Sequence, residues 1–167
     1  ILTDVTGVQT CALPISLSDQ PLALFVLDMK TGTLLRTFSP DAAALIGGVG
    51  HTQVSSMPSY AYGGTFSDST IDTDQWDISR NGAYSDDALY LGYVRKDTTT
   101  GSPSINKFAK GGVLRLLTGD DADPANWHVS TVIDGVGPVS SAVVKLQDKY
   151  AKNLWLYFGT GRYNYKS

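Results

Sequence analysis

The sequence has a single cysteine, Cys11, among its 167 residues. One cysteine cannot form an intrachain disulfide or a site with several thiolate ligands, so neither can hold this fold together. Charged residues are also scarce: they make up 17% of the chain, the net charge is −3, and no basic run occurs. A nucleic-acid-binding surface is therefore not expected, because such surfaces concentrate Lys and Arg.

Long hydrophobic runs are missing as well. The longest, residues 22–27, is far shorter than the roughly 20 apolar residues that a membrane-spanning helix needs. No charged segment leads into an apolar one at the start of the chain, so no signal peptide is expected. No long stripe of apolar residues recurs at helical spacing. Because 42% of the residues are hydrophobic, the chain is expected to form one globular domain that is nearly all β.

Short apolar or alternating segments mark the expected strands. They are residues 22–27, 33–38, 52–56, 87–94, 112–117, 127–133, 139–146 and 154–158. The first two should form a hairpin, because Gly32 supplies the positive φ of a tight turn between them. Residues 42–46 fit either a short helix or a short edge strand. The glycines and polar residues of 63–68 indicate a loop.

Three of these strands look like copies of one another. Residues 24–27, 89–92 and 154–157 read Leu-Phe-Val-Leu, Leu-Tyr-Leu-Gly and Leu-Trp-Leu-Tyr, and their starts are 65 residues apart. A Gly-led strand follows the first two, and a Val-Ser-Ser strand precedes the last two, at Val54 and Val139. Four strands per cycle are typical of a β-propeller blade. The sequence therefore predicts a partial β-propeller: one complete four-stranded antiparallel blade over about 51–133, with parts of two neighbouring blades.

The N-terminal segment differs in kind. Residues 5–15 read Val-Thr-Gly-Val-Gln-Thr-Cys-Ala-Leu-Pro-Ile, which resembles the in-frame translation of a common sequencing adapter. Residues 1–16 are therefore expected to be a non-native scar, and residues 17–167 to be a fragment of a propeller domain. The alternative is a genuine exposed coil. Either way, this stretch is not expected to pack against the domain.

An acidic stretch, residues 72–87, leads into the central apolar strand. It places oxygen-bearing side chains at alternate positions and then a glycine, Gly82, as the opening of a calcium-binding loop does. The loop lacks the closing Glu of an EF-hand, so the expectation is a shorter calcium loop between β elements. A solvated Asp-rich turn is the alternative. The candidate calcium ligands are the side chains of Asp77, Ser79, Asn81, Asp86 and Asp87 and the backbone carbonyl of Ala83.

Catalysis and sugar binding are two further functions to compare with this pattern. His51 and His128 could each belong to a Ser-His-Asp set, but no Gly-x-Ser-x-Gly elbow accompanies them. The chain is therefore not expected to be an enzyme. Its aromatic side chains fit either a sugar-binding face or ordinary filling between blades. These aromatics are Tyr60, Tyr62, Trp76, Tyr90, Tyr93 and Trp127.

Taken together, the acidic loop and the strand after it resemble a known family. Residues 77–94 are similar to the Asp-x-Asn-x-Asp-Gly-x-x-Asp-Ala-x-Tyr-x-Gly segment of the PilY family, the calcium-binding β-propeller proteins of type IV pili. Residues 112–116 and the Phe-Gly-Thr-Gly-Arg-Tyr turn within 156–163 also resemble that propeller, and the likeness covers most of residues 17–167. The matching positions are Asp77, Ser79, Asn81, Gly82, Asp87, Ala88, Tyr90 and Gly92.

The resemblance implies a function. It implies a bacterial cell-surface or extracellular protein that supports pilus biogenesis, adhesion and twitching motility. Its partners would be other pilus components, the remaining blades of the propeller and host or surface ligands. The family loop holds its outer aspartates closer together than Asp77 and Asp87, which are ten residues apart here, and Ser79 and Asn81 replace stronger ligands. A weak or degenerate Ca²⁺ site is therefore expected.

A second resemblance leaves an alternative open. Residues 24–32 read Leu-Phe-Val-Leu-Asp-Met-Lys-Thr-Gly, which is similar to the repeat of quinoprotein propellers. That likeness implies a quinoprotein-like oxidoreductase fragment, although only fragments of the repeat occur. A sugar-binding propeller is the third alternative.

Overall fold

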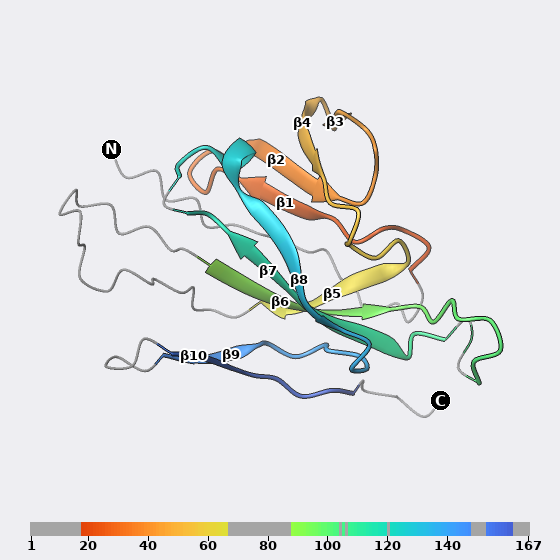
Figure 1. The fold of residues 1–167 in the computed structure, drawn as a ribbon. Helices are drawn as coiled ribbons and strands as arrows, with labels where there is room; N and C mark the ends of the chain where they lie inside the picture. The colour runs from red at the N-terminus through yellow and green to blue at the C-terminus, as the bar shows by residue number, and fades with distance from the viewer. Residues whose placement is uncertain are drawn as a thin grey trace.

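The computed structural model describes residues 18–66, 88–103, 105, 107–119, 121–147 and 153–161. In this part of the chain the elements are β-strands and one short 3₁₀ helix. The strands form three sheets that lie one above another, with a four-stranded sheet in the middle (Figure 1). The expectation of an all-β chain is confirmed, and none of the three sheets closes on itself.

The first sheet has the order β1-β2-β4-β3. Its strands are β1 (Leu24–Leu27), β2 (Leu34–Ser39), β3 (Leu45–Ile46) and β4 (Val49–Gln53). β1 and β2 pair antiparallel, which confirms the predicted hairpin. β2 and β4 pair in parallel, with Thr37 opposite His51, so this sheet is not a simple meander. The short strand β3 decides the ambiguity of residues 42–46 in favour of an edge strand.

Asp28 organises the turn of the first hairpin. Its Oδ1 accepts hydrogen bonds from the backbone N–H of Lys30 at 3.0 Å and of Thr31 at 2.7 Å. Gly32 follows with a φ of 71°, the left-handed conformation that glycine adopts without strain. The hydrogen bond from the backbone of Thr31 is the main cause that lowers the pKa of the Asp28 carboxyl. An ionised aspartate therefore fixes this turn.

The middle sheet is a regular meander, with each strand antiparallel to the next along the chain. Its strands are β5 (Ala61–Phe66), β6 (Ala88–Arg95), β7 (Lys110–Leu117) and β8 (His128–Asp134). The 3₁₀ helix η1 (Pro124–Asn126) precedes β8, and the side chain of Asp123 caps it by accepting from the backbone N–H of Ala125 at 2.9 Å. Proline at the first helical position suits this cap, because that position needs no N–H donor.

The third sheet is a two-stranded antiparallel ribbon of β9 (Val144–Gln147) and β10 (Leu154–Tyr157). Before it, the chain crosses the middle sheet at Val139, which is fully buried and whose N–H donates to the carbonyl of Tyr93 at 3.2 Å. Gly161 returns to the same place, pairing in parallel with Val139. The ribbon is thereby tied to the middle sheet through one crossing segment.

The middle sheet buries both of its faces, as the strict alternation of side chains along its strands allows. Along β6, Leu89, Leu91 and Tyr93 face the first sheet, whereas Ala88 and Tyr90 face the ribbon. The core on the first side consists of Leu22, Leu24, Val26, Phe38, Met57, Ala61, Leu91, Tyr93, Leu114, Leu116, Trp127 and Val129. The core on the ribbon side consists of Ala88, Tyr90, Val113, Val139 and Val143, with Leu117, Leu156 and Phe158 packed against it.

Two glycines make room for the crossing segment. A Cβ on Gly92 would lie 2.5 Å from Val139 Cγ1, and one on Gly64 would lie 2.7 Å from the Val139 carbonyl oxygen. Both distances are well below van der Waals contact, so only glycine permits this approach. The N–H of Thr65 also donates to the carbonyl of Ser140 at 3.0 Å. The glycines of β5 and β6 therefore mark a packing site and not a loop.

The first strand of the middle sheet was predicted in the wrong place. Residues 63–66, expected to be loop, belong to β5, whereas Val54 lies in a turn that follows β4. The complete four-stranded sheet thus runs over 61–134 and not 51–133. Val139 likewise makes an isolated bridge, and the strand expected from that position begins only at Val144. The Val-Ser-Ser motif therefore does not form the first strand of either unit.

The three Leu-rich strands, which were predicted to be equivalent, do not all occupy equivalent positions. Leu91 of β6 and Leu156 of β10, which are 65 residues apart, both face the sheet that precedes their own. Leu24 and Val26 of β1 face the middle sheet, which follows theirs. β1 also pairs only with the strand after it, whereas β6 pairs on both sides. β1 therefore occupies a different position from β6, and its sequence likeness to β6 does not reflect a structural repeat.

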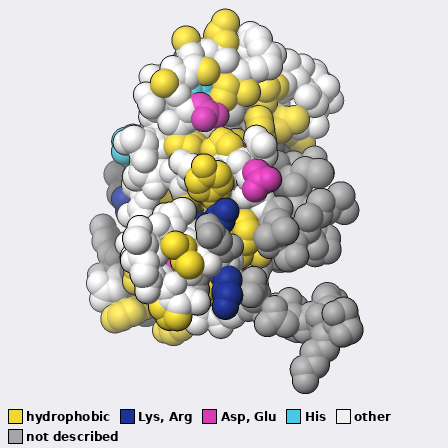
Figure 2. Space-filling view, turned by 90° about the vertical axis from the view of Figure 1, so that its right-hand side faces the viewer, with side chains coloured by type: hydrophobic (Ala, Val, Ile, Leu, Met, Phe, Trp, Pro, Cys, Tyr) yellow, Lys and Arg dark blue, Asp and Glu magenta, His cyan; other side chains and the backbone are white. Residues whose placement is uncertain are grey.

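The surface is sparsely charged. On the face shown in Figure 2, charged side chains are separated from one another and hydrophobic side chains lie between them. This agrees with the low charged fraction of 17%. The residues that the structure describes include no helix that is long and apolar enough to span a membrane.

Candidate functional site

The predicted calcium ligands lie outside the described residues. Asp77, Ser79, Asn81, Ala83, Asp86 and Asp87 all fall within residues 67–87. The structure fixes both ends of that segment, because Phe66 ends β5 and Ala88 begins β6, and these strands are adjacent in the middle sheet. Phe66 and Ala88, which flank these 21 residues, therefore lie at the same end of the β5–β6 pair. Among the residues described, no group of His, Cys, Asp or Glu is arranged to hold a metal ion.

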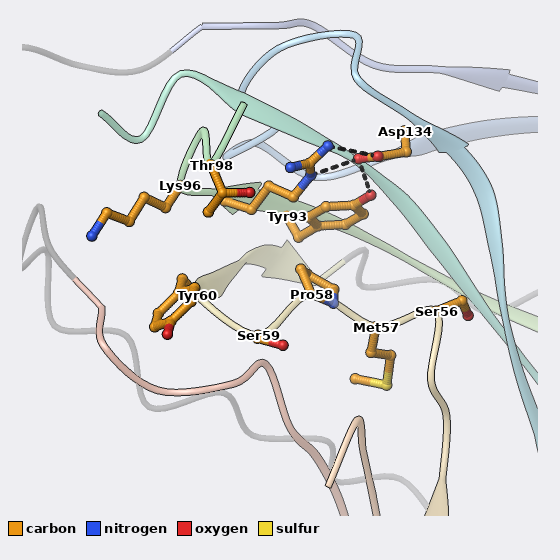
Figure 3. A pocket seen from close by; sticks show the side chains of 10 residues that line it. Ser56, Met57, Pro58, Ser59, Tyr60, Tyr93, Lys96, Thr98 and Asp134 are labelled. Atoms are coloured by element: carbon orange, nitrogen blue, oxygen red, sulfur yellow. Dashed lines mark hydrogen bonds and ion pairs between the residues drawn. The ribbon is translucent and has the colours of Figure 1, made fainter. Parts of the chain in front are cut away.

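The described part of the chain offers a different site on the first-sheet side of β6. A hollow of about 330 Å³ lies between the end of β6 and the segment that joins β4 to β5. Figure 3 shows Tyr93 and Asp134 on one wall and Pro58, Ser59 and Tyr60 on the facing wall. This space, the Tyr93 hollow, is defined by Pro58, Tyr60, Tyr93, Arg95, Lys96 and Asp134.

A three-residue hydrogen-bonded cluster forms one wall of the Tyr93 hollow. Asp134 accepts from the Tyr93 hydroxyl at 2.6 Å and from Arg95 Nε and Nη2 at 3.0 and 2.8 Å (Figure 3). The Arg95–Asp134 pair is therefore bidentate, the geometry that best fixes a guanidinium. Tyr93 and Arg95 are two residues apart on β6 and share a face.

A glycine on the intervening strand makes this cluster possible. Tyr93 and Asp134 lie on β6 and β8, and both are opposite Gly112 of β7. A Cβ on Gly112 would lie 2.8 Å from the Tyr93 hydroxyl oxygen and 2.0 Å from the Ile133 carbonyl oxygen. Because Gly112 has no side chain, the Tyr93 ring lies across β7 and reaches the carboxylate on the far strand.

The cluster sets the ionisation of its members. Burial is the main cause that raises the pKa of the Tyr93 hydroxyl, and its hydrogen bond to Asp134 raises it further. The hydrogen bond from Arg95 is the main cause that lowers the pKa of Asp134, and the same bond raises the pKa of Arg95. The cluster therefore holds a neutral phenol, a carboxylate and a guanidinium over the whole range of ordinary pH.

The facing wall is held by backbone hydrogen bonds. The Pro58 carbonyl accepts from Leu22 N–H at 3.0 Å, and the Tyr60 carbonyl accepts from Lys96 N–H at 2.9 Å. Lys96 Nζ lies 5.5 Å from the centroid of the Tyr60 ring, within the range of a cation–π contact. Met57 is buried in the first core and anchors the segment beneath. The hollow therefore has two fixed walls that belong to different parts of the sequence.

The aromatic side chains considered for a sugar-binding face do not gather on one surface. Tyr60 and Tyr93 line the Tyr93 hollow. Tyr90 is in the core next to the ribbon, and Trp127 is in the opposite core, where its Nε1 donates to the Asp121 carbonyl at 2.6 Å. Tyr62 packs on Phe108, with ring centroids 5.9 Å apart. Trp76 lies outside the described residues.

His51, considered for a Ser-His-Asp set, does pair with a serine. Its Nε2 is 2.9 Å from Ser39 Oγ, and its Nδ1 is 2.5 Å from the Ala43 carbonyl oxygen. Because a carbonyl only accepts, Nδ1 carries the proton and Nε2 accepts from the Ser39 hydroxyl. Ser39 is fully buried, however, and a nucleophile must reach its substrate. The pair therefore joins β2 to β4, and the Ala43 contact adds the segment before β3. His128 is exposed at the start of β8.

Comparisons with protein-family models, with curated proteins and with solved structures found no match to this chain. Arg95 and Asp134, which complete the Tyr93 cluster, were not singled out from the sequence. The available signal was Tyr-Val-Arg at the end of a strand, which places an aromatic and a cation on one face.

Proposed function

We propose that this chain is part of a calcium-binding β-propeller of the PilY type. Such a module would act at the bacterial cell surface in type IV pilus biogenesis, adhesion and twitching motility. The observation that carries the proposal is the middle sheet, a four-stranded antiparallel meander covered on both faces by other sheets. Stacked sheets of this kind are the building principle of a propeller.

The ribbon supports the same proposal. The inner face of the ribbon packs on the middle sheet, whereas its outer face is open to solvent and apolar. Trp155 of β10 corresponds to Tyr90 of β6 in the 65-residue repeat, and Tyr90 is covered by the ribbon. A further blade would cover Trp155 in the same way. The exposed outer residues are Val144 at 59%, Leu146 at 57%, Trp155 at 54% and Tyr157 at 55%.

The position of the acidic segment supports the calcium part. An insertion that leaves and rejoins one edge of a rigid sheet can close around a cation without disturbing the strands. Ca²⁺ prefers six to eight oxygen ligands, which the side chains of the segment and water could supply together. The anchor residue Ala88 is buried, so the loop ends on a fixed point.

Calcium titration of the 167-residue chain by isothermal calorimetry tests this proposal. We expect a dissociation constant of about 10⁻⁴–10⁻³ M, the range of extracellular calcium modules. Asp77→Asn and Asp87→Asn should each weaken calcium binding about tenfold or more. Asp19→Asn, which changes an exposed aspartate distant in sequence from the acidic stretch, should not weaken it. Equal binding by all variants, or none at 10 mM calcium, would contradict the calcium assignment.

Sugar binding is the second candidate function. The observation that favours it is the Tyr93 hollow, which combines an exposed aromatic ring with charged and hydroxyl-bearing side chains. It is compatible with an adhesive role, because cell-surface adhesion commonly uses carbohydrate ligands. The chemistry of the hollow narrows the class of sugar.

A further inference from the structure

We propose that the Tyr93 hollow binds a single sugar ring that carries a carboxylate, a uronic acid. The site lies on the first-sheet side of β6, at the Arg95 end of the strand, and none of the candidate calcium ligands is among its lining residues. The proposal deepens the adhesive role given above and rests on it for its biological setting. Its chemistry rests only on described residues.

The size of the hollow limits the ligand. Its volume of about 330 Å³ is at the lower end of the roughly 300–1,000 Å³ that ligand pockets span. A ligand the size of one sugar ring fits this range, whereas a nucleotide or a long chain would extend out of it.

A guanidinium in the lining favours an acidic ligand. The residues that line the hollow include two cations, Arg95 and Lys96, and one anion, Asp134, and the buried carboxylate of Asp97 also acts on Arg95. Arg95 uses Nε and Nη2 for Asp134, and its Nη1 has no hydrogen-bond partner in the described part of the chain. The bidentate pair fixes the guanidinium plane, so Nη1 presents its N–H donors at a set position.

The remaining lining fits a ring with hydroxyl groups. Tyr60 is 45% exposed, and with Pro58 it offers a flat apolar surface of the kind on which sugar rings stack. Ser56, Ser59 and Thr98 also line the space, and within the described residues their hydroxyls have no hydrogen-bond partner. Each hydroxyl can donate or accept, as sugar hydroxyls require.

Three ligands test separately whether the sugar ring and the carboxylate are needed for binding. The 167-residue chain is titrated with glucuronate, with glucose as the neutral sugar, and with acetate as the carboxylate without a ring. Binding is followed by NMR or calorimetry. We expect glucuronate to bind with a dissociation constant of about 1 mM, as suits a ligand of this size. Glucose and acetate should each bind about tenfold more weakly or not measurably. Added salt should weaken glucuronate binding, because the charges are near the surface.

Variants then place the ligand in the hollow. Lys96→Gln and Tyr60→Ala should each weaken glucuronate binding about fivefold or more, while Lys30→Gln, an exposed lysine in the β1–β2 turn, should leave it unchanged. Thermal unfolding of each variant confirms that the fold is kept. Equal binding of glucose would overturn the carboxylate preference, and equal binding of acetate would reduce the hollow to an anion site.

The outcome is separable from that of the calcium proposal. Glucuronate binding should persist in excess chelator and in Asp77→Asn, because the proposed contacts are made by the lining residues of the Tyr93 hollow, and Asp77 is not among them. No glucuronate binding, with calcium binding intact, would overturn the inference and leave the calcium assignment standing. Glucuronate binding without calcium binding would overturn the calcium assignment and leave the inference standing.

Discussion

At the scale of single residues, the most informative contact is the one that joins Tyr93 to Asp134 across β7. It needs three conditions at once: an aromatic on β6, a carboxylate at the end of β8, and no side chain at Gly112 between them. The Tyr93 side chain is buried as a whole, and its hydrogen bond to Asp134 is partly buried at the wall of the hollow.

Removing this hydroxyl should destabilise the chain in a pH-dependent way. Tyr93→Phe should lower the free energy of unfolding by about 1–2 kcal/mol at pH 7. The pKa of Tyr93 is raised in the folded protein, so the unfolded chain loses this proton first, and stability falls as pH rises above about 10. The difference between wild type and variant should therefore shrink from pH 10 upward. Urea unfolding at pH 7, 9 and 11 measures it, and a constant difference would contradict the assignment.

Asp134 should contribute stability that is lost at low pH and not at high pH. Its pKa is lowered in the folded protein, so the stability it provides is present above its ordinary pKa of about 3.9 and is lost as pH falls through the folded value. Because its side chain is 42% exposed, Asp134→Asn should cost only about 1 kcal/mol at pH 7. The cost should become smaller as pH falls below about 3.9. Urea unfolding of both proteins at pH 7 and pH 2 checks this, and an equal cost at both would refute it.

At the scale of elements, the close contact of Gly64 and Gly92 with Val139 decides how the ribbon docks. Gly92→Ala should lower the free energy of unfolding by about 1–3 kcal/mol, because the added methyl group would overlap Val139. Gly159→Ala is the matched control: nothing lies within 4 Å of its Cβ position and its φ is not positive, so it should change stability by less than about 0.5 kcal/mol. Chemical denaturation compares the two. Equal effects would mean that the crossing segment moves aside freely.

The sequence predicted those strands whose own residues show apolar alternation or are bounded by turn glycines. The hairpin of β1 and β2, and the pairing of β6 with β7, follow from apolar alternation and from turn glycines. β5 was missed because Gly63 and Gly64 resemble a loop until Val139, more than 70 residues later, is known to lie against Gly64. The parallel pairing of β2 with β4 was missed for a similar reason, since it depends on the buried Ser39–His51 contact.

The two candidate sites differ in the same way, because one follows from a local sequence pattern and the other does not. An acidic calcium loop is a local pattern and could be proposed from residues 72–87 alone. The Tyr93 hollow could not, because its walls come from segments about 35 to 75 residues apart. Tyr60 and Tyr93 were noted as candidate sugar-binding aromatics, but nothing in the sequence indicated that these two would face each other and that Tyr90 and Trp127 would be buried elsewhere.

At the scale of the whole molecule, the open outer face of the ribbon should govern behaviour in solution. Two cross-strand pairs, Trp155 with Leu146 and Tyr157 with Val144, place four apolar side chains on it. Exposed patches of this kind favour association. We expect the chain to self-associate at about 100 µM in sedimentation velocity.

A double variant tests whether the outer face of the ribbon causes the self-association. Leu146→Thr with Trp155→Thr keeps residues that favour strands and should make the chain largely monomeric while changing unfolding free energy by less than about 1 kcal/mol. Met29→Thr, which removes an exposed apolar side chain elsewhere, serves as the control and should leave association unchanged. A monomeric wild type, or association unaffected by the double variant, would show that the ribbon face is not responsible.

The meander of the middle sheet also has a consequence for the order of folding. Each of β6, β7 and β8 pairs with the strand just before it, so these pairings close short stretches of chain and can form early. The ribbon can dock only after that surface exists, because Val139 needs the formed β5–β6 pair to lie against. In native-state hydrogen exchange, the amides of β6 and β7 should then exchange last and those of β9 and β10 well before them, as two separate units of opening.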